Sequence, residues 1–273
     1  MLRRDGFGGQ SVPERAKVFV SVFVRTAFSG AVAMLAACTP APTPSGIDDP
    51  YEASNRRTHA FNKSLDRSVL RPVSNGYVKV VPEPVVTGIG NVANNLATPS
   101  MVVNNVLQGD VEGAVVNTFR FALNSTVGLA GLFDVATWLE LEQHDTDFGE
   151  TLYTWGVPEG AYVELPVMGP STQRETAGRV VDLFTNPLGY TLENPEKYAA
   201  PAAGVAKKLG DRGRYSQTVD SVLYDSADSY AQGRVTYLQN RRYKLSGGAG
   251  DALDPYGDAT TGTGDPYDDP YDQ

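Results

Sequence analysis

The amino-acid sequence predicts an all-α fold, mainly helical, with one short irregular or hairpin segment. Apolar residues recur at helical spacing in segments 85–96 and 111–127. Strict alternation of apolar and polar residues is confined to a short run from Ala161 to Leu165. The sequence pattern also lacks the near-continuous apolar strands of a buried parallel sheet.

The N-terminus has the pattern of an export signal. Four basic residues lie in the first 17 positions, and an apolar run follows from Val18 to Ala37. The run ends in Leu35-Ala36-Ala37-Cys38, which resembles the lipobox of bacterial lipoproteins, where the chain is cut before a cysteine whose thiol is lipidated. Cys38 is the only cysteine, so no intramolecular disulfide is possible. We expect residues 1–37 to be a signal peptide and Cys38 to carry the lipid; the alternative is a membrane anchor with an incidental cysteine.

Two further segments lie outside the expected folded core. Residues 38–48 are rich in proline and predict a tether between the lipid and the fold. Residues 246–273 contain seven aspartates and three Asp-Pro-Tyr triplets but no lysine or arginine, a composition that buries too little apolar area to fold. The sequence predicts a disordered acidic tail there, either a solvating terminus or a tyrosine-bearing ligand for a partner. Residues 49–245 remain as one helical domain.

The first helices of that domain are predicted from apolar spacing and from the residues that end helices. A helix is expected from Tyr51 to Leu70, with Arg71-Pro72 ending it. A second helix is expected over 85–96, and Pro99 is a favoured first-turn residue for a third. Gln108-Gly109-Asp110 then has the order of a helix stop, a turn and the N-cap of the next helix.

The segment from 84 to 133 has 50 residues but only three charged ones. A helix is predicted from Val111 to about Val127, on which Asn117, Arg120 and Asn124 form a narrow polar stripe because they lie three and four positions apart. The rest of the circumference is apolar, the reverse of an ordinary surface helix. The helix is too short and too polar to span a bilayer alone. We expect the stripe to face a protein interior or a wet cavity, in a membrane-seated protein or in the core of a soluble one.

The second half of the core is predicted to be irregular at first and helical afterwards. Residues 148–170 are rich in glycine, proline and aromatic residues and lack helical periodicity, so a short strand or hairpin is the most regular structure expected there. Thr172 and Glu175 fit a capping box that opens a helix. Further helices are predicted over 196–209, where Pro201 would kink or split the helix, and over 216–224 and 225–243.

The charge balance and the histidine content exclude several functions. The formal charge is −9, which argues against nucleic-acid binding, because phosphate contacts come from clustered basic residues. The serine-hydrolase motif G-x-S-x-G is missing, and His59 and His144 lack the spacing of a zinc site. We expect no catalytic residue, no metal and no cofactor apart from the lipid on Cys38, and therefore a protein that is not an enzyme.

A series of motifs runs in order along the core and carries a resemblance to one family. The motifs are Asp49-Pro-Tyr-Glu52, Asn55-Arg56, Arg71-Pro72-Val73, Val103-Asn-Asn-Val-Leu-Gln-Gly-Asp110, Phe119-Arg-Phe-Ala-Leu-Asn124, Gly128-Leu-Ala-Gly-Leu-Phe-Asp-Val-Ala136, Phe148-Gly-Glu-Thr-Leu152, Trp155-Gly-Val157, Tyr162, Leu165-Pro166 and Gly169-Pro170. Together they resemble the MlaA/VacJ family of outer-membrane lipoproteins. The resemblance covers roughly Asp49 to Tyr190 and continues loosely to Tyr243; the acidic tail is not part of it.

The resemblance implies a fold, a function and partners. Family members form a mainly helical ring around an amphipathic pore, on the periplasmic side of the outer membrane. They remove phospholipids misplaced in the outer leaflet, which maintains lipid asymmetry. They associate with a trimeric porin and pass the lipid to an MlaC-like periplasmic carrier that feeds an inner-membrane ABC transporter. For this chain the resemblance therefore implies a lipid-anchored transport protein with phospholipid as its cargo.

The resemblance also suggests which residues serve that function. We expect Asn117, Arg120 and Asn124 either to line the channel or to bond the loop that lines it. Phe61 and Asn62 match a family segment and are expected to influence the resting state of the pore. Residues 148–170 are expected to form a loop that gates or braces the channel. Its candidate residues are Trp155, Gly156, Tyr162, Pro166 and Gly169. Ordinary packing is the alternative for each of these residues.

Two other classes of function remain open on the sequence. A structural envelope lipoprotein or a porin-associated tether would hold its partner without transport activity and would depend on the acidic tail. A periplasmic lipid hydrolase would have to use His59 or His144 as its base.

Overall fold

The computed structural model describes residues 46–247. The expected signal peptide 1–37, Cys38, most of the tether 38–48 and nearly all of the acidic tail 246–273 lie outside the described residues.

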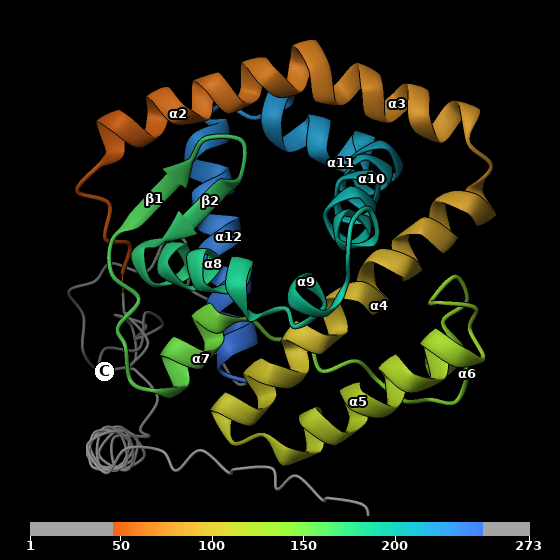
Figure 1. The fold of residues 1–273 in the computed structure, drawn as a ribbon. Helices are drawn as coiled ribbons and strands as arrows, with labels where there is room; N and C mark the ends of the chain where they lie inside the picture. The colour runs from red at the N-terminus through yellow and green to blue at the C-terminus, as the bar shows by residue number, and fades with distance from the viewer. Residues whose placement is uncertain (1–45, 248–273) are drawn as a thin grey trace, which may run out of the picture.

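The described chain forms a ring of helices with one small hairpin (Figure 1). Its elements are α2 Glu52–Leu65, π-helix η1 Asp66–Leu70, α3 Arg71–Val80, α4 Glu83–Gln108, α5 Val111–Thr126, α6 Val135–Trp138, α7 Phe148–Thr154, β1 Tyr162–Leu165, β2 Gly169–Thr172, α8 Gln173–Thr185, α9 Leu188–Thr191, 3-10 helix η2 Glu196–Tyr198, α10 Ala199–Arg214, α11 Ser216–Asp220, π-helix η3 Ser221–Asp225 and α12 Ser229–Leu245. The prediction of a mainly helical fold is confirmed.

Helices α2, η1 and α3 run on without a break and form one long arc along one edge of the ring (Figure 1). The prediction that Arg71-Pro72 ends the first helix is therefore wrong. The backbone N–H of Arg71 bonds to the carbonyl of Asp66, five residues back, which widens the helix by one residue. Pro72 then falls in the first turn of α3, where a missing N–H and a fixed φ do not interrupt the hydrogen bonds.

Helix α4 continues through Pro99, so the prediction of a separate helix starting there is also wrong. A proline inside a helix removes one hydrogen bond and disturbs the preceding turn. A neighbouring segment supports that turn, because the Asn186 side chain donates to the carbonyl of Leu96 over 2.9 Å. The helix ends at Gly109, whose φ of +76° suits glycine, and Asp110 caps α5 by accepting from the Gly113 N–H over 2.8 Å. The predicted stop, turn and N-cap are confirmed.

The segment 148–170 contains one element that was not predicted and one that was. Phe148–Thr154 forms α7, capped by Asp147, which accepts from the Glu150 N–H over 2.9 Å, so the expectation of no helix in this segment is wrong. Strands β1 and β2 pair antiparallel, with Tyr162 opposite Thr172, which confirms the hairpin. The predicted cap of the next helix is also confirmed, since Thr172 accepts from the Glu175 N–H.

The ring closes where the N-terminal segment meets α12. Asp49 bonds to Tyr230 and to Arg234, and Arg56 forms two bonds of 3.1 and 2.9 Å with Asp228. A small hydrophobic core lies beside this junction and consists of Tyr162, Tyr230 and Leu238. On the opposite side α4 packs against α5 and α10, and α10 packs against α3.

Candidate functional site

The outward surface of α4 and α5 is apolar. We call this surface the outer apolar face; its groove of about 350 Å³ is lined by Val102, Val106, Gly109, Val111, Ala114, Val115, Thr118 and Phe119. Val111 is 73% exposed and Phe119 is 61% exposed. Contiguous exposed apolar patches on soluble proteins are uncommon and mark contact with a partner or a membrane. Within residues 46–247 no helix has the length and apolarity needed to cross a membrane.

Behind this face lies a buried polar network. Asn117 is fully buried, and its Nδ2 donates to Asn105 Oδ1 over 2.8 Å and to the carbonyl of His144 over 2.9 Å. Its Oδ1 accepts from the His144 N–H over 3.2 Å. The Asn117 amide therefore fastens α5 to the backbone of the segment before α7.

Arg120 and Asn124 hold the same connecting segment, residues 127–147, at a second place. Arg120 forms an ion pair with Asp134 at 3.0 Å, and its guanidinium also donates to Thr137. Asn124 donates to Asp134 over 2.9 Å and accepts from the Ala136 N–H over 3.0 Å. Burial alone would raise the pKa of Asp134, but bonds from Thr137 and Asn124 and the charge of Arg120 hold that pKa below its usual value.

The three stripe residues therefore lie on one buried side of α5, as the helical spacing predicts, and hold the segment 127–147 at two places: Arg120 and Asn124 share Asp134, and Asn117 bonds to His144. Of the two roles expected for them, the geometry matches bonding to a neighbouring loop, because all three contact the segment 127–147. That this segment lines a lipid path stays a prediction. The α4–α5 pair thus places its polar groups inside and its apolar groups outside.

Asn62 lies against the hairpin, whereas Phe61 is half exposed. The Asn62 Nδ2 donates to the carbonyl of Leu165 over 2.9 Å, and its Oδ1 accepts from the Val167 N–H over 2.7 Å. These two bonds fix the turn between β1 and β2 that contains Pro166. Gly169 begins β2 with a φ of +78°.

The remaining candidate residues of the expected gating loop lie at two separate places. Trp155 donates to the carbonyl of Leu107 over 3.0 Å, which joins the end of α7 to the end of α4, and Gly156 follows with a φ of +83°. Tyr162 is buried in the hairpin, where its hydroxyl donates to Glu164 over 2.5 Å. Tyr162, Pro166 and Gly169 share the hairpin, but Trp155 and Gly156 do not join them. The gating role of all five stays a prediction.

His59 links three elements through buried hydrogen bonds. Its Nε2 lies 3.0 Å from Ser229 Oγ on α12, and its Nδ1 lies 3.4 Å from Glu164 Oε1 on β1. Ser229 and Glu164 are both buried, and the three residues border a cavity of about 210 Å³. His144, the other histidine, lies 3.6 Å from Asp110 and is partly exposed.

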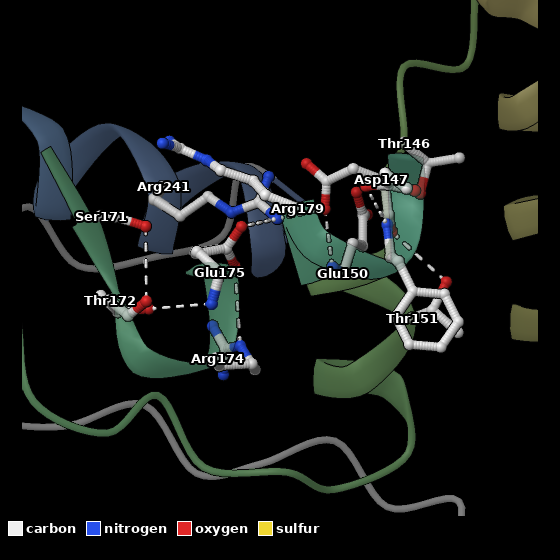
Figure 2. Close-up of polar contacts among 12 residues, drawn as sticks. Thr146, Asp147, Glu150, Thr151, Ser171, Thr172, Arg174, Glu175, Arg179 and Arg241 are labelled. Atoms are coloured by element: carbon white, nitrogen blue, oxygen red, sulfur yellow. Dashed lines mark hydrogen bonds and ion pairs between the residues drawn. The ribbon is translucent and has the colours of Figure 1, made fainter. Parts of the chain in front are cut away.

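A cluster of ions holds α12 to α7 and α8 (Figure 2). The Arg241 guanidinium lies 2.6 Å from Asp147 and 2.7 Å from Glu175, while Arg174 approaches Glu175 from the other side at 3.6 Å. Burial raises the pKa of Glu175, and the charge of Asp147 raises it further. Burial would also raise the pKa of Asp147, but Arg241 outweighs it and lowers that pKa. The pKa of Glu150, buried beside them, is raised.

Sequence reasoning missed a groove that four elements enclose. We call it the α9 groove, since α9 lies between α8 and α10 in Figure 1 and α4 completes the wall. Its volume is about 520 Å³, and its lining residues are Ala93, Leu96, Ala97, Leu183, Phe184, Asn186, Leu188, Gly189, Tyr190, Leu192, Lys197, Ala200, Pro201 and Gly204. The available signal was the pair Leu183-Phe184, which is separated by Thr185 alone from the helix-ending Asn186-Pro187. Among residues 46–247 no three metal-ligating side chains gather in one place.

Comparisons with known proteins agree with this fold. The family model described as MlaA lipoprotein matches residues 47–244. A curated relative from Escherichia coli strain K12, "Intermembrane phospholipid transport system lipoprotein MlaA", is 33% identical over 209 residues, 74% of this chain and 80% of the relative. The protein of that name from Haemophilus influenzae is 32% identical with the same coverage. An uncharacterized protein from Rickettsia typhi is 34% identical over 196 residues, 71% of this chain and 77% of the relative.

A solved structure matches as well. It was reported as "Structural basis for maintenance of bacterial outer membrane lipid asymmetry" and superposes with a TM-score of 0.63 at 31% sequence identity. The match covers 72% of this chain and 98% of the solved chain. The chain belongs to the MlaA lipoprotein family.

Proposed function

We propose that this protein removes mislocalised phospholipids from the outer leaflet of the outer membrane and hands them to a periplasmic carrier. Membership of the MlaA lipoprotein family supports this proposal, since curated relatives are named for intermembrane phospholipid transport. The related solved structure concerns outer-membrane lipid asymmetry. The chain is a transporter component, and its chemistry is binding and passage of lipid without catalysis.

The observation that carries the proposal is the reversed polarity of the α4–α5 pair. Its exposed surface is rich in valine and phenylalanine, and its buried side carries asparagines and Arg120. In water this arrangement is unfavourable, because each exposed apolar Å² costs about 25 cal/mol. In hydrocarbon it is favourable, because polar groups at membrane depth face a protein interior. At 16 residues α5 is about 24 Å long, shorter than the roughly 30 Å of a bilayer core, so α5 sits within the membrane without spanning it.

The partners and the location follow from the same proposal. The covalent lipid on Cys38 anchors the protein on the periplasmic side of the outer membrane. A trimeric porin surrounds or adjoins the ring, and an MlaC-like carrier receives the lipid and delivers it to an inner-membrane ABC transporter. The names of the relatives support a multi-component system, because they call it an intermembrane transport system.

The residues proposed for the lipid path act through the elements they fasten. Asn117, Arg120 and Asn124 hold the segment 127–147 in place. Asn62 holds the hairpin turn, so a change at Phe61 or Asn62 shifts the hairpin and the resting state of the pore.

A strain that lacks this protein tests the proposal. Thin-layer chromatography of outer-leaflet phospholipid should show accumulation, which the full-length chain reverses. A chain without residues 246–273 should reverse it nearly as well, because the acidic tail lies beyond the family match at 47–244. Unchanged outer-leaflet phospholipid in the strain would overturn the transport function. Complete loss of complementation on removal of the tail would favour the structural tether.

A hydrolase is a second candidate, favoured by one specific observation. Ser229, His59 and Glu164 have the order of nucleophile, base and orienting acid, with contacts of 3.0 and 3.4 Å. The same contacts also serve as a structural bridge between α12, α2 and β1. Phospholipid retrieval that is unaffected in the doubly substituted His59→Gln, Ser229→Ala protein would exclude the hydrolase, while lysophospholipid released by the unmodified protein alone would favour it.

A further inference from the structure

The α9 groove has the dimensions of a ligand site. Its volume of about 520 Å³ falls inside the range of roughly 300–1,000 Å³ that small-molecule sites occupy. Most of its wall is made of alanine, leucine, glycine, proline and aromatic side chains contributed by α4, α8, α9 and α10. A ligand that fills it must therefore be largely apolar.

The rim of the groove consists of large apolar side chains that the protein itself leaves uncovered. Leu183 is 73% exposed, Phe184 is 66% exposed and Tyr190 is 70% exposed. Val180 lies three and four positions before Leu183 and Phe184 and is also exposed, so the C-terminal half of one face of α8 is apolar and exposed. An occupant that covers this rim removes apolar surface from water, which is the main source of binding free energy for an apolar ligand.

The neutral polar groups of the groove are already used within the protein. The Asn186 side chain donates to the carbonyl of Leu96 and accepts from the Leu188 N–H over 3.0 Å. The Tyr190 hydroxyl donates to the carbonyl of Phe184 over 3.1 Å. These groups hold α9 in position and are not available to a ligand.

Lys197 is the exception. Its ammonium group lies 5.2 Å from the ring of Tyr198 and forms no ion pair with any carboxylate of residues 46–247. It is partly buried and borders the groove. A groove that is apolar along its length and carries one available positive charge is complementary to an apolar chain with an anionic group near one end.

We propose that the α9 groove holds one fatty acyl chain of a phosphoglyceride, with Lys197 contacting the phosphate. The inference rests on the proposed transport function and names the place where the cargo is held in transit. The rim of exposed leucine and aromatic residues packs against the upper part of the chain, while the second acyl chain lies outside the groove. Lys197 distinguishes phospholipids from diacylglycerol, which has the same chains but no phosphate.

Glycines in and outside the groove provide a matched pair of blocking variants. A side chain added at Gly204 meets no atom within 4 Å, because the position faces the open groove. Gly76 is equally unobstructed and also helical, but it lies on α3 away from the groove. Gly204→Phe places a ring in the groove from a position where its Cβ meets no atom, and Gly76→Phe is its control. Both substitutions remove a helix-interior glycine, so neither is expected to destabilise its helix.

The test uses full-length lipidated protein in vesicles of phosphatidylethanolamine and phosphatidylglycerol with radiolabelled acyl chains. The photoreactive residue p-benzoylphenylalanine replaces Phe184. Irradiation should cross-link phospholipid to the protein, and Gly204→Phe should abolish the product whereas Gly76→Phe should not. Lys197→Met should reduce cross-linking about tenfold, as loss of a charge-assisted contact predicts, and Lys208→Met on the adjoining helix α10 should leave it unchanged.

Each other result overturns the groove assignment. Cross-linking that survives Gly204→Phe would show contact with bulk lipid at the surface. A product that contains only free fatty acid would show that the phosphate takes no part in binding. A product that diacylglycerol yields equally well would show the same. The transport function is judged separately from outer-leaflet phospholipid in cells. If Gly204→Phe yields no cross-link yet restores lipid asymmetry, the groove is not the place where cargo is held in transit, and transport stands. If the deletion strain accumulates no phospholipid while cross-linking behaves as expected, transport fails and the groove stands.

Discussion

The α4–α5 pair and the α12 cluster both bury polar groups, but they do so in opposite ways. Behind the outer apolar face the buried groups are mainly neutral amides, joined by a single ion pair between Arg120 and Asp134. At α12 the buried groups are ions, and Arg241 there shares two carboxylates. The exposed residues differ as well, since the α4–α5 surface is rich in valine and phenylalanine.

This difference indicates that the two sides meet different solvents. Amide networks tolerate a low-dielectric surrounding because every donor finds an acceptor and no net charge is left. Ion clusters are better placed beside water, which lowers the cost of the charges that the pairing does not cancel. We infer that the α4–α5 side lies in hydrocarbon and that the α12 side lies in water.

The largest expected effect comes from removing the acid behind the outer apolar face. Asp134→Ala leaves Arg120, whose side chain is 4% exposed, without its carboxylate partner. Breaking a buried ion pair from one side costs about 3–5 kcal/mol, so the free energy of unfolding in detergent should fall by that amount. Circular dichroism recorded during urea unfolding measures this free energy. Glu112→Ala removes an exposed carboxylate from α5, the helix that carries Arg120. It is the control and should change the free energy of unfolding little. Equal effects of the two changes would contradict the network.

An intermediate effect is expected from a charge placed on the outer apolar face. Phe119→Lys puts an ammonium group where the proposal places hydrocarbon, at a cost of up to about 3 kcal/mol near the centre of the layer. In a Cys38→Ser background, which removes the proposed site of lipid attachment, the protein should then bind vesicles up to about 100-fold more weakly. Val80→Lys is the control, because Val80 is 80% exposed at the end of α3 and away from this face. If both changes weaken binding alike, the α4–α5 pair is not the membrane-contacting side.

Local signals in the sequence predicted those parts of the fold that depend on a few neighbouring residues. Gly109 and Asp110 end one helix and start the next, and Thr172 caps α8, all through contacts within five positions along the chain. Pro72 and Pro99 were misjudged because a widened turn and the distant Asn186 side chain accommodate them. The spacing of neighbouring residues predicts neither the widened turn nor the contact from Asn186.

The candidate site was predictable to a similar extent. The spacing of Asn117, Arg120 and Asn124 placed them on one stripe, and in the structure all three bond to the segment 127–147. Their partners were not predictable, because Asp134 and His144 reach the stripe through the path of an irregular segment. The α9 groove was missed for the same reason, since its wall combines residues from 93 to 204 that only the closed ring brings together.

The smallest effect concerns the pH dependence of stability at the α12 cluster. The raised pKa values of Glu175 and Glu150 mean that the folded protein binds protons that the unfolded chain releases above about pH 4.5. Stability should therefore increase as the pH falls from 7 towards 5. The lowered pKa of Asp147 acts in the opposite direction, because its contribution is complete above about pH 4 and is lost as the pH falls through its folded-state pKa.

Glu175→Gln separates these two contributions. Glutamine does not titrate, so the variant should lose much of the rise in stability between pH 7 and 5 while keeping the fall below pH 4. Each unit of raised pKa corresponds to about 1.4 kcal/mol, which is smaller than the loss expected for Asp134→Ala. Urea midpoints measured from pH 2.5 to 8 give the profile, and the exposed Glu193→Gln serves as the control. A Glu175→Gln profile parallel to that of the unmodified protein would mean that Glu175 titrates as it does in the unfolded chain. The α12 side would then resemble the α4–α5 side, where bonds from Thr137 and Asn124 and the charge of Arg120 hold the pKa of Asp134 below its usual value.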